Sequence, residues 1–275
     1  MAAVDAGFAP HVPWAMMYTQ PPAANEVDGS LFMGLRYRIG YTSSKIYASK
    51  ALGKLDKAFS ANLFYWDDQP GDPVHDEVLW QQQQFGALLD NRVNVPEAGD
   101  ASPKQALVSM LNQPGVTPLA VMYLYCHCSV GDGNTPVLRF GAKPSPDYTI
   151  SRRELGGSAF ADKPLVFANA CTTAVADPYM ANELAATFFR RDCRAYIGTE
   201  IKMPIVFASR FAFLFFNFFY RKIDPDPIAG GEAVAQSRVW LWTNYRNIGG
   251  LFYSYVNQYD LYMADEEEVK GMRRR

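Results

Sequence analysis

Cys171 and His127 are residues able to do nucleophilic chemistry, and they stand at corresponding places in the chain. His127 follows the apolar run 119–126, and Cys171 follows the apolar run 164–170. Both runs are short and rich in large apolar residues, which is typical of buried parallel strands. In an open α/β sheet, side chains at the carboxyl ends of such strands meet one another and a ligand. The sequence therefore predicts that the thiol and the imidazole lie together.

The chemistry open to this pair is nucleophilic catalysis. A free thiol is mostly protonated at neutral pH, and a neighbouring imidazole that accepts the proton makes the sulfur a competent nucleophile. The other histidines, His11 and His75, follow no predicted strand. Taken singly, a strand-end Cys is often a core residue and a strand-end His a satisfied polar group. The pairing of the two is what favours catalysis.

A metal site built from Cys126, His127, Cys128 and Cys171 is the alternative use of these side chains. Adjacent residues on a strand point to opposite faces, and the chain lacks the paired Cys-x-x-Cys spacing of structural zinc sites. We therefore expect no metal and no organic cofactor.

The elements expected around the pair alternate between strands and helices. Their predicted ranges are a strand at 61–66, a helix at 76–89, a strand at 92–95, a helix at 103–111 capped by Ser102, the strand before His127, a hairpin at 136–140 and 147–150, the strand before Cys171, a helix at 182–191, a strand at 195–199, and helices at 205–221 and 230–243. This alternation predicts an α/β fold, a mostly parallel sheet flanked by helices on both faces.

Length and composition favour one large domain. The chain has 275 residues, of which 49% are hydrophobic, enough for a single large core. We expect residues 1–45, with a possible strand at 12–18 and a further segment at 31–39, to be an N-terminal arm packed on a domain formed by residues 46–275. The Phe-rich stretch 204–220 is short for a membrane span and contains Arg210 and Asn217, which favours a buried helix that could also support a homo-oligomer.

Charge and the N-terminal sequence restrict partners and location. A net charge of -2 leaves no electrostatic footprint for nucleic acid. The first residues lack the charged and apolar regions of a secretory signal, so we expect reduced cysteines and a cytoplasmic protein without membrane attachment.

Four motifs, in this order, identify a resemblance that covers most of the chain: Val12-Pro-Trp-Ala15, Tyr125-Cys-His-Cys128, Phe167-Ala-Asn-Ala-Cys-Thr-Thr-Ala174 and Gly231-Glu-Ala-Val-Ala235. With them the chain resembles the CHAT family of caspase-like cysteine peptidases, of clan CD. The histidine precedes the cysteine by 44 positions, close to the spacing of about 50 in caspases.

The resemblance implies a caspase-like sheet and a cysteine endopeptidase. Cys171 would be the nucleophile and His127 the general acid and base, and the backbone N–H groups of Cys171 and Cys128 would form the oxyanion pocket. Family members usually have Gly after the histidine and an acidic residue after the cysteine, whereas this chain has Cys128 and Thr172.

The same resemblance implies a substrate-binding role for Asn169, in the pocket for the residue before the cut. A neutral side chain there favours a neutral or apolar residue, unless Asp132 or Glu200 supplies a charge. The stretch from Glu200 to Met203 could hold an extended substrate as an added strand, or it could be a plain connection.

The resemblance to CHAT proteins implies that this chain is a regulated bacterial protease that cuts a protein partner in antiviral defence or cell death. We expect latency until an activating partner or sensor protein, cleavage or oligomerisation orders the loop 131–134. A catalytically silent scaffold that binds a partner protein is the alternative, motivated by Cys128 and Thr172. An α/β-hydrolase is a third, although Asn169 and Thr173 stand where its nucleophile turn needs Gly.

Overall fold

A computed structural model gives the structure of the chain. It describes residues 2–5, 13–21, 28–42, 52–55, 60–66, 70–89, 91–95, 102–112, 119–130, 136–141, 145–157, 159–160, 162–171, 181–220, 228–257 and 260–263.

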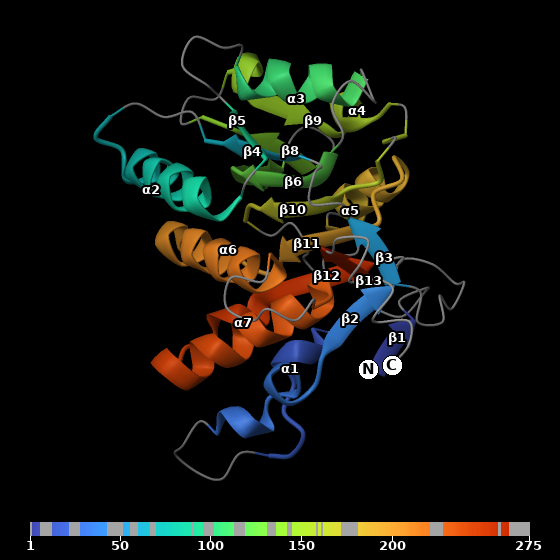
Figure 1. Ribbon diagram of the computed structural model, residues 1–275, viewed down its shortest axis with the longest axis vertical. Helices are drawn as coiled ribbons and strands as arrows, with labels where there is room; N and C mark the ends of the chain where they lie inside the picture. The colour runs from blue at the N-terminus through green and yellow to red at the C-terminus, as the bar shows by residue number, and fades with distance from the viewer. Residues whose placement is uncertain are drawn as a thin grey trace.

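The centre of the molecule is an eight-stranded sheet in the order β1-β2-β12-β11-β10-β6-β4-β5 (Figure 1). Its strands are β1 (Ala2–Asp5), β2 (Ile39–Thr42), β4 (Ser60–Tyr65), β5 (Arg92–Val95), β6 (Leu119–Tyr125), β10 (Leu165–Asn169), β11 (Ala195–Thr199) and β12 (Tyr253–Asn257). Every neighbouring pair is parallel except β11 with β12. Every residue of β6, β10 and β11 is buried, as expected for strands covered on both faces.

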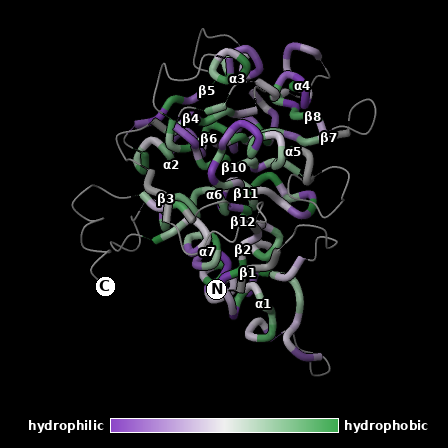
Figure 2. Tube along the Cα trace, turned by 90° about the vertical axis from the view of Figure 1, so that its right-hand side faces the viewer, coloured by the Kyte–Doolittle hydropathy of each residue, from purple (hydrophilic) through white to green (hydrophobic). Residues whose placement is uncertain are grey.

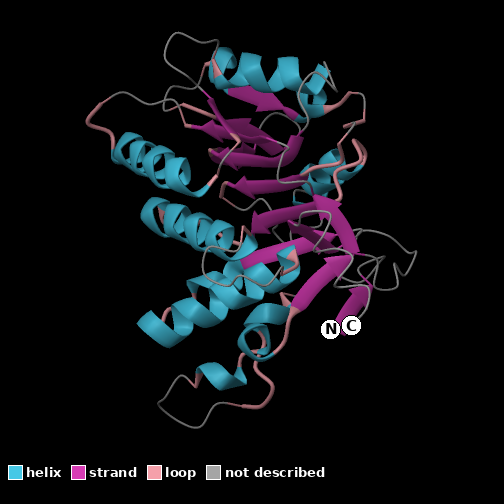
Figure 3. Ribbon diagram, in the orientation of Figure 1, coloured by secondary structure: helices cyan, strands magenta, loops and turns pink. Residues whose placement is uncertain are grey.

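Helices cover both faces of this sheet, as Figure 3 shows. One face packs against α2 (Pro73–Leu88), α6 (Ile205–Phe219) and α7 (Gly230–Tyr245), and the other packs against α3 (Pro103–Asn112), α4 (Arg152–Leu155) and α5 (Ala181–Phe189). Alternate residues of each strand enter the two layers: Tyr123 and Phe167 face the first, and Met122 and Val166 face the second. The expected fold class, a mostly parallel sheet with helices on both faces, is confirmed.

Two small sheets accompany the main one. The first is antiparallel and contains β7 (His127–Val130), β8 (Pro136–Arg139) and β9 (Thr149–Ser151). The second pairs β3 (Leu52–Leu55) with β13 (Asp260–Met263) in parallel. The predicted hairpin of 136–140 with 147–150 is present as β8 and β9, with a 3-10 turn at Pro146–Tyr148 before β9.

The N-terminal region differs from the expectation. The predicted strand at 12–18 is wrong: residues Trp14–Met16 form a 3-10 turn, with the Met16 N–H donating to the Pro13 carbonyl. The segment at 31–39 begins in a turn at Gly29–Leu31, capped by Asp28, and continues in the short α1 (Met33–Arg36). The chain then enters β2, which pairs with β12 inside the main sheet.

The Phe-rich stretch is the buried helix that the sequence predicts. In α6 most of the Phe side chains are buried against β10, β12 and α7. Among the residues that the structure describes, no helix is long and apolar enough to cross a membrane.

Candidate active site

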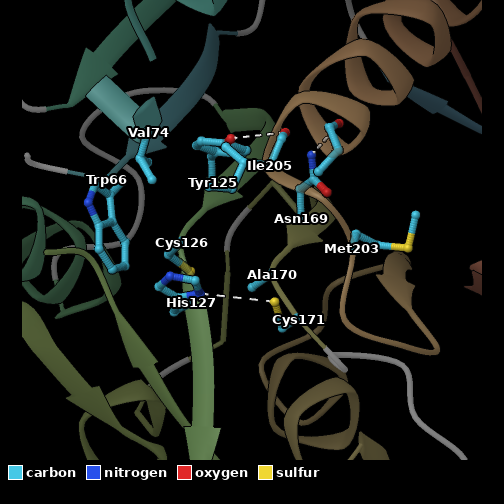
Figure 4. Close-up of a pocket in the computed structure, with 11 residues that line it drawn as sticks. Trp66, Val74, Tyr125, Cys126, His127, Asn169, Ala170, Cys171, Met203 and Ile205 are labelled. Carbon is cyan, nitrogen blue, oxygen red and sulfur yellow. Dashed lines mark hydrogen bonds between the residues drawn. The ribbon is translucent and has the colours of Figure 1, made fainter. Parts of the chain in front are cut away.

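The register of two neighbouring strands brings His127 and Cys171 together. In the parallel pair of β6 and β10, Tyr125 lies opposite Asn169. His127 and Cys171 each come two residues later, so both leave the sheet at the same level. The Cys171 Sγ lies 4.0 Å from the His127 Nδ1, at the outer limit for a hydrogen bond to sulfur (Figure 4).

A change of direction after β6 places the imidazole. Cys126 is a bend, and His127 opens β7, where it pairs with Arg139 of β8. The His127 ring meets the Trp66 ring edge to face, with the ring centroids 4.4 Å apart. The Arg139 guanidinium lies 5.4 Å from the centroid of the Trp66 ring. Aromatic packing and strand pairing therefore hold the half-buried ring beside the sulfur.

The surroundings of His127 keep it neutral at pH 7. Burial lowers the pKa of His127, the positive charges of Arg139 and Lys202 lower it further, and only the Asp72 carboxylate acts against them. A neutral imidazole can accept the thiol proton of Cys171, which is the requirement for a general base.

The other cysteines are unsuited to be nucleophiles. Burial raises the pKa of Cys128 to about 12 and raises the pKa values of Cys126 and Cys193 well above the ordinary value. Cys126 and Cys193 are also buried, whereas Cys171 is partly exposed. Cys171 is thus the cysteine that combines access with a base.

The dyad opens into a pocket of about 370 Å³, which includes open space at its mouth. Besides His127 and Cys171, its wall consists of mainly apolar residues, namely Trp66, Val74, Tyr125, Cys126, Asn169, Ala170, Met203, Ile205 and Ala208. Of the described residues lining it, none is an Asp, Glu, Lys or Arg. A small apolar side chain fits this wall.

Asn169 lies in the pocket wall, yet its amide already has partners. Its Nδ2 donates to the Tyr123 hydroxyl and to the Ala208 carbonyl, both at 2.8 Å, and its Oδ1 accepts from the Tyr253 hydroxyl at 2.9 Å. The side chain is buried. Asn169 therefore ties β10 to β6, β12 and α6 directly beneath Cys171.

The structure distributes the other predicted site residues differently. Met203 lies in the pocket wall, as Asn169 does. Glu200 lies outside it: the carboxylate is buried and accepts a hydrogen bond from the Ser254 hydroxyl, and it acts electrostatically on Arg238 of α7. Asp132 and Thr172 lie outside the described residues.

The pocket wall also contains residues that were not anticipated from the sequence, among them Trp66, Val74, Ile205 and Ala208. Trp66 ends the run 61–66 and lies beyond β4, the neighbour of β6, so the strand-end rule that found His127 could have found it. The others belong to α2 and α6, and no local pattern shows which helix residues reach the end of a sheet.

The metal-site alternative depends on the grouping of possible ligand side chains. Among the described residues, no cluster of three or more His, Cys, Asp or Glu side chains could hold a metal ion.

Comparisons with known proteins complete the description of the site. No family model matches the chain. Over 211 residues, 75% of the chain, it is 29% identical to a probable protease of Vitiosangium sp. (strain GDMCC 1.1324), and it spans 26% of that protein's length. Among solved structures, separase in the Saccharomyces cerevisiae separase–securin complex is similar over 79% of this chain and 13% of that one, with 13% identity and a TM-score of 0.48. The Arg-specific cysteine proteinase gingipain R is similar over 72% of this chain and 45% of that one, with 10% identity and a TM-score of 0.48.

Proposed function

We propose that this chain is a cysteine endopeptidase of the caspase-like kind, with Cys171 as nucleophile and His127 as general base and acid. The observation that carries the proposal is the 4.0 Å contact between the Cys171 Sγ and the His127 Nδ1, at the ends of two in-register parallel strands and beside a pocket. The similarity of three quarters of the chain to a probable protease supports it.

The reaction follows from the positions of the two side chains. His127 takes the thiol proton, and the Cys171 sulfur attacks the carbonyl carbon of the peptide bond. The C–N bond then breaks as His127 gives its proton to the leaving amine, which leaves a thioester on Cys171. In the second half His127 deprotonates a water molecule, the water attacks the thioester, and the C–S bond breaks to return the thiol.

The oxyanion that forms in each half needs hydrogen-bond donors. We assign the backbone N–H groups of Cys171 and Cys128 to this role, because each belongs to, or directly follows, a residue of the dyad. Backbone donors do not depend on the side chain, so Cys can stand at position 128 where CHAT proteins have Gly.

Turnover of fluorogenic peptides by the intact chain, Cys171→Ala and His127→Ala tests the dyad. We expect each variant to lose about 10³-fold or more in kcat/KM, since a dyad acts as a unit. Cys193→Ala is the matched control, because it removes a thiol outside the site, and it should keep its activity. Retained turnover in either dyad variant would contradict the proposal. Silence of the intact chain would leave a latent enzyme or a scaffold that binds a partner, and would move the search to an activating partner.

The apolar wall predicts the residue before the cut. We expect a neutral or apolar residue to be preferred, because no described charge lines the pocket to pair with Arg or Lys. Met203→Glu should increase the ratio of kcat/KM for Arg over Leu substrates about tenfold or more, whereas Met203→Gln, of similar size, should not. Cleavage after Arg alone by the intact chain would contradict this preference.

For the biological role we propose cleavage of a partner protein by a cytoplasmic bacterial enzyme, held latent until it is activated. Two features support this proposal: the CHAT resemblance and the bacterial relative named a probable protease.

A further inference from the structure

A second hollow lies on the other side of the sheet from α2, α6 and α7. It is formed where the end of β9 and the short α4 meet the C-terminal end of α5. It encloses about 1110 Å³, which includes open space at its mouth, and shares no residue with the dyad pocket. Its wall is dominated by arginines and consists of Ser151, Arg152, Arg153, Gly156, Gly157, Thr187, Arg190 and Arg191. This set is called the arginine cleft below.

The arginine cleft is strongly positive. Half of its residues carry a guanidinium group, and none of its described wall residues is an Asp or Glu. Figure 2 shows α4 mostly in the purple of hydrophilic residues. The acid of α4, Glu154, has other partners: its carboxylate meets Lys104 at 2.8 Å and the Ser151 backbone N–H and hydroxyl at 2.9 Å. Glu154 is therefore engaged by partners outside the cleft wall.

Arg191 gives the cleft a buried cation. Its side chain is 1% exposed and lies against the Phe160 ring, 4.9 Å from its centroid. Its guanidinium donates to the carbonyls of Leu155, at 2.9 Å, and Leu111, and its Nε has no hydrogen-bond partner among the described residues. A buried charge paired only with carbonyl dipoles is costly, and an anion in the cleft would offset that cost.

The Gly157 backbone packs over this cation. Gly157 has φ +151, and a Cβ there would lie 3.2 Å from the Arg191 Nη1, so the lack of a side chain lets the backbone approach the guanidinium closely. Arg153 and Arg190 are exposed, and the Arg190 Nη2 donates to the Thr187 hydroxyl at 2.9 Å. A fixed buried guanidinium thus has two exposed guanidinium groups around it.

We propose that the arginine cleft binds a small molecule that carries two or more phosphate groups. Guanidinium groups bind phosphate oxygens in bidentate fashion, and several arginines together suit a chain of phosphates better than a single carboxylate. With about 1110 Å³ including the open space at its mouth, the cleft is large enough for a small molecule, since small-molecule sites enclose roughly 300 to 1000 Å³. Inorganic polyphosphates and nucleoside polyphosphates share this chemistry.

Two structural elements connect the arginine cleft to the dyad, so a ligand in the cleft could influence the dyad. On one side, β9 pairs with β8, and β8 pairs with β7, which begins at His127. On the other side, α5 is the first described element after Cys171. A ligand that bridges α4 and α5 would therefore bias the relative positions of the two catalytic residues. We assign it a regulatory effect on turnover, a part of the inference that rests on the proposed function.

Calorimetric titration of the Cys171→Ala protein with tripolyphosphate, and separately with ATP, tests the site without requiring activity. The double variant Arg153→Gln/Arg190→Gln removes two exposed charges from the cleft and should weaken tripolyphosphate binding at least about tenfold. The control Arg36→Gln/Arg92→Gln removes two exposed charges elsewhere and should change the affinity less than about twofold. ATP binding of similar strength would identify a nucleotide site, and weaker ATP binding would identify a site for phosphate chains alone.

Three results would overturn the proposal. They are no binding of either probe at millimolar concentration, equal weakening by the control pair, and preferential binding of a hexaglutamate peptide over tripolyphosphate, which would mark a surface for an acidic protein. Arg191→Gln is not needed for the test, since loss of this buried residue could unfold the protein.

The regulatory part is measured on the unmodified chain, as kcat/KM with and without tripolyphosphate. Binding without a change in kcat/KM would remove the regulatory link and leave the site. A chain that stays without peptidase activity both with and without tripolyphosphate would remove the regulatory link and leave the calorimetric result standing.

Discussion

At His127, burial and two cations lower the imidazole pKa, and Asp72 alone opposes them. The two sequence-distant groups Arg139 and Asp72 thus act on the same ring with opposite sign. Because the free-enzyme pH profile of kcat/KM reports the ionisation of an essential base, these groups set where activity is lost in acid. Activity should persist below the ordinary pKa of histidine, about 6.5.

Replacement of Arg139 should shift the pH at which activity is lost in acid. In Arg139→Gln a neighbouring positive charge is lost, so the imidazolium form is favoured and the His127 pKa rises. The acid limb of the kcat/KM profile should therefore move to higher pH. Arg139→Lys keeps the charge and should leave the limb in place, and a shift of equal size in both variants would show that stacking on Trp66 matters more than charge.

The sequence predicts that His127 and Cys171 lie together, but it does not predict the partners that fix them. Two strand-end positions suffice to bring His127 and Cys171 together. The hydrogen bonds of Asn169, in contrast, come from Tyr123, Ala208 and Tyr253, which lie on three different elements. Only the assembled sheet shows that Asn169 supports the pocket through the three hydrogen bonds of its side-chain amide.

Between elements, a buried polar group joins α7 to the sheet. Arg238 of α7 donates to the Tyr253 carbonyl at 2.5 Å, and its pKa is lowered to about 10, mainly by burial and against the opposing charges of Tyr41 and Glu200. Glu200, just after β11, accepts from Ser254 of β12. This arrangement gives Glu200 a structural task in place of contact with the pocket.

The variant Glu200→Gln tests whether Glu200 stabilises the fold or binds substrate. It removes the negative charge that acts on the buried Arg238, so we expect the free energy of unfolding in urea to fall by about 1 to 3 kcal/mol. The KM for peptides should stay unchanged. Glu232→Gln, which breaks the partly exposed pair with Arg38 at 3.0 Å, is the control and should cost about 1 kcal/mol or less. A raised KM at unchanged stability would instead place Glu200 in substrate binding.

The helices and strands were predicted best where the spacing of apolar residues and the turn or capping residues at the ends indicate the same element. α2, α3 and β11 lie within a few residues of their predicted ranges, and Asp72 and Ser102 cap the two helices. The 12–18 segment misled because its apolar residues are held by local turn bonds and by the Tyr41 hydroxyl, which accepts from the Trp14 N–H. β12 was not predicted, because a five-residue run after a loop carries little signal by itself.

At the scale of the molecule, the sheet combines early and late parts of the chain. β12 lies between β11 and β2, so Val256 pairs with Tyr41 across most of the chain. The Tyr253 hydroxyl of the same strand reaches Asn169 beneath the dyad. Pocket and sheet therefore depend together on residues 253–257.

Shortened chains test this dependence. A chain ended after residue 248 lacks β12 and should lose both cooperative unfolding, followed by circular dichroism, and peptide turnover. A chain ended after residue 263 keeps every described strand and should retain both. Turnover by the shorter chain at the rate of the longer one would show that β12 is dispensable.

The place of β12 also bears on how the protein is made. On the ribosome, β2 emerges long before the strand that it needs, and β6 and β10 can pair while β12 is still inside the exit tunnel. The support beneath Cys171 is then incomplete until translation has passed Tyr253. The proposed dyad therefore gains its full support only after most of the chain has been synthesised, so we expect the proposed cleavage of other chains to begin late in translation.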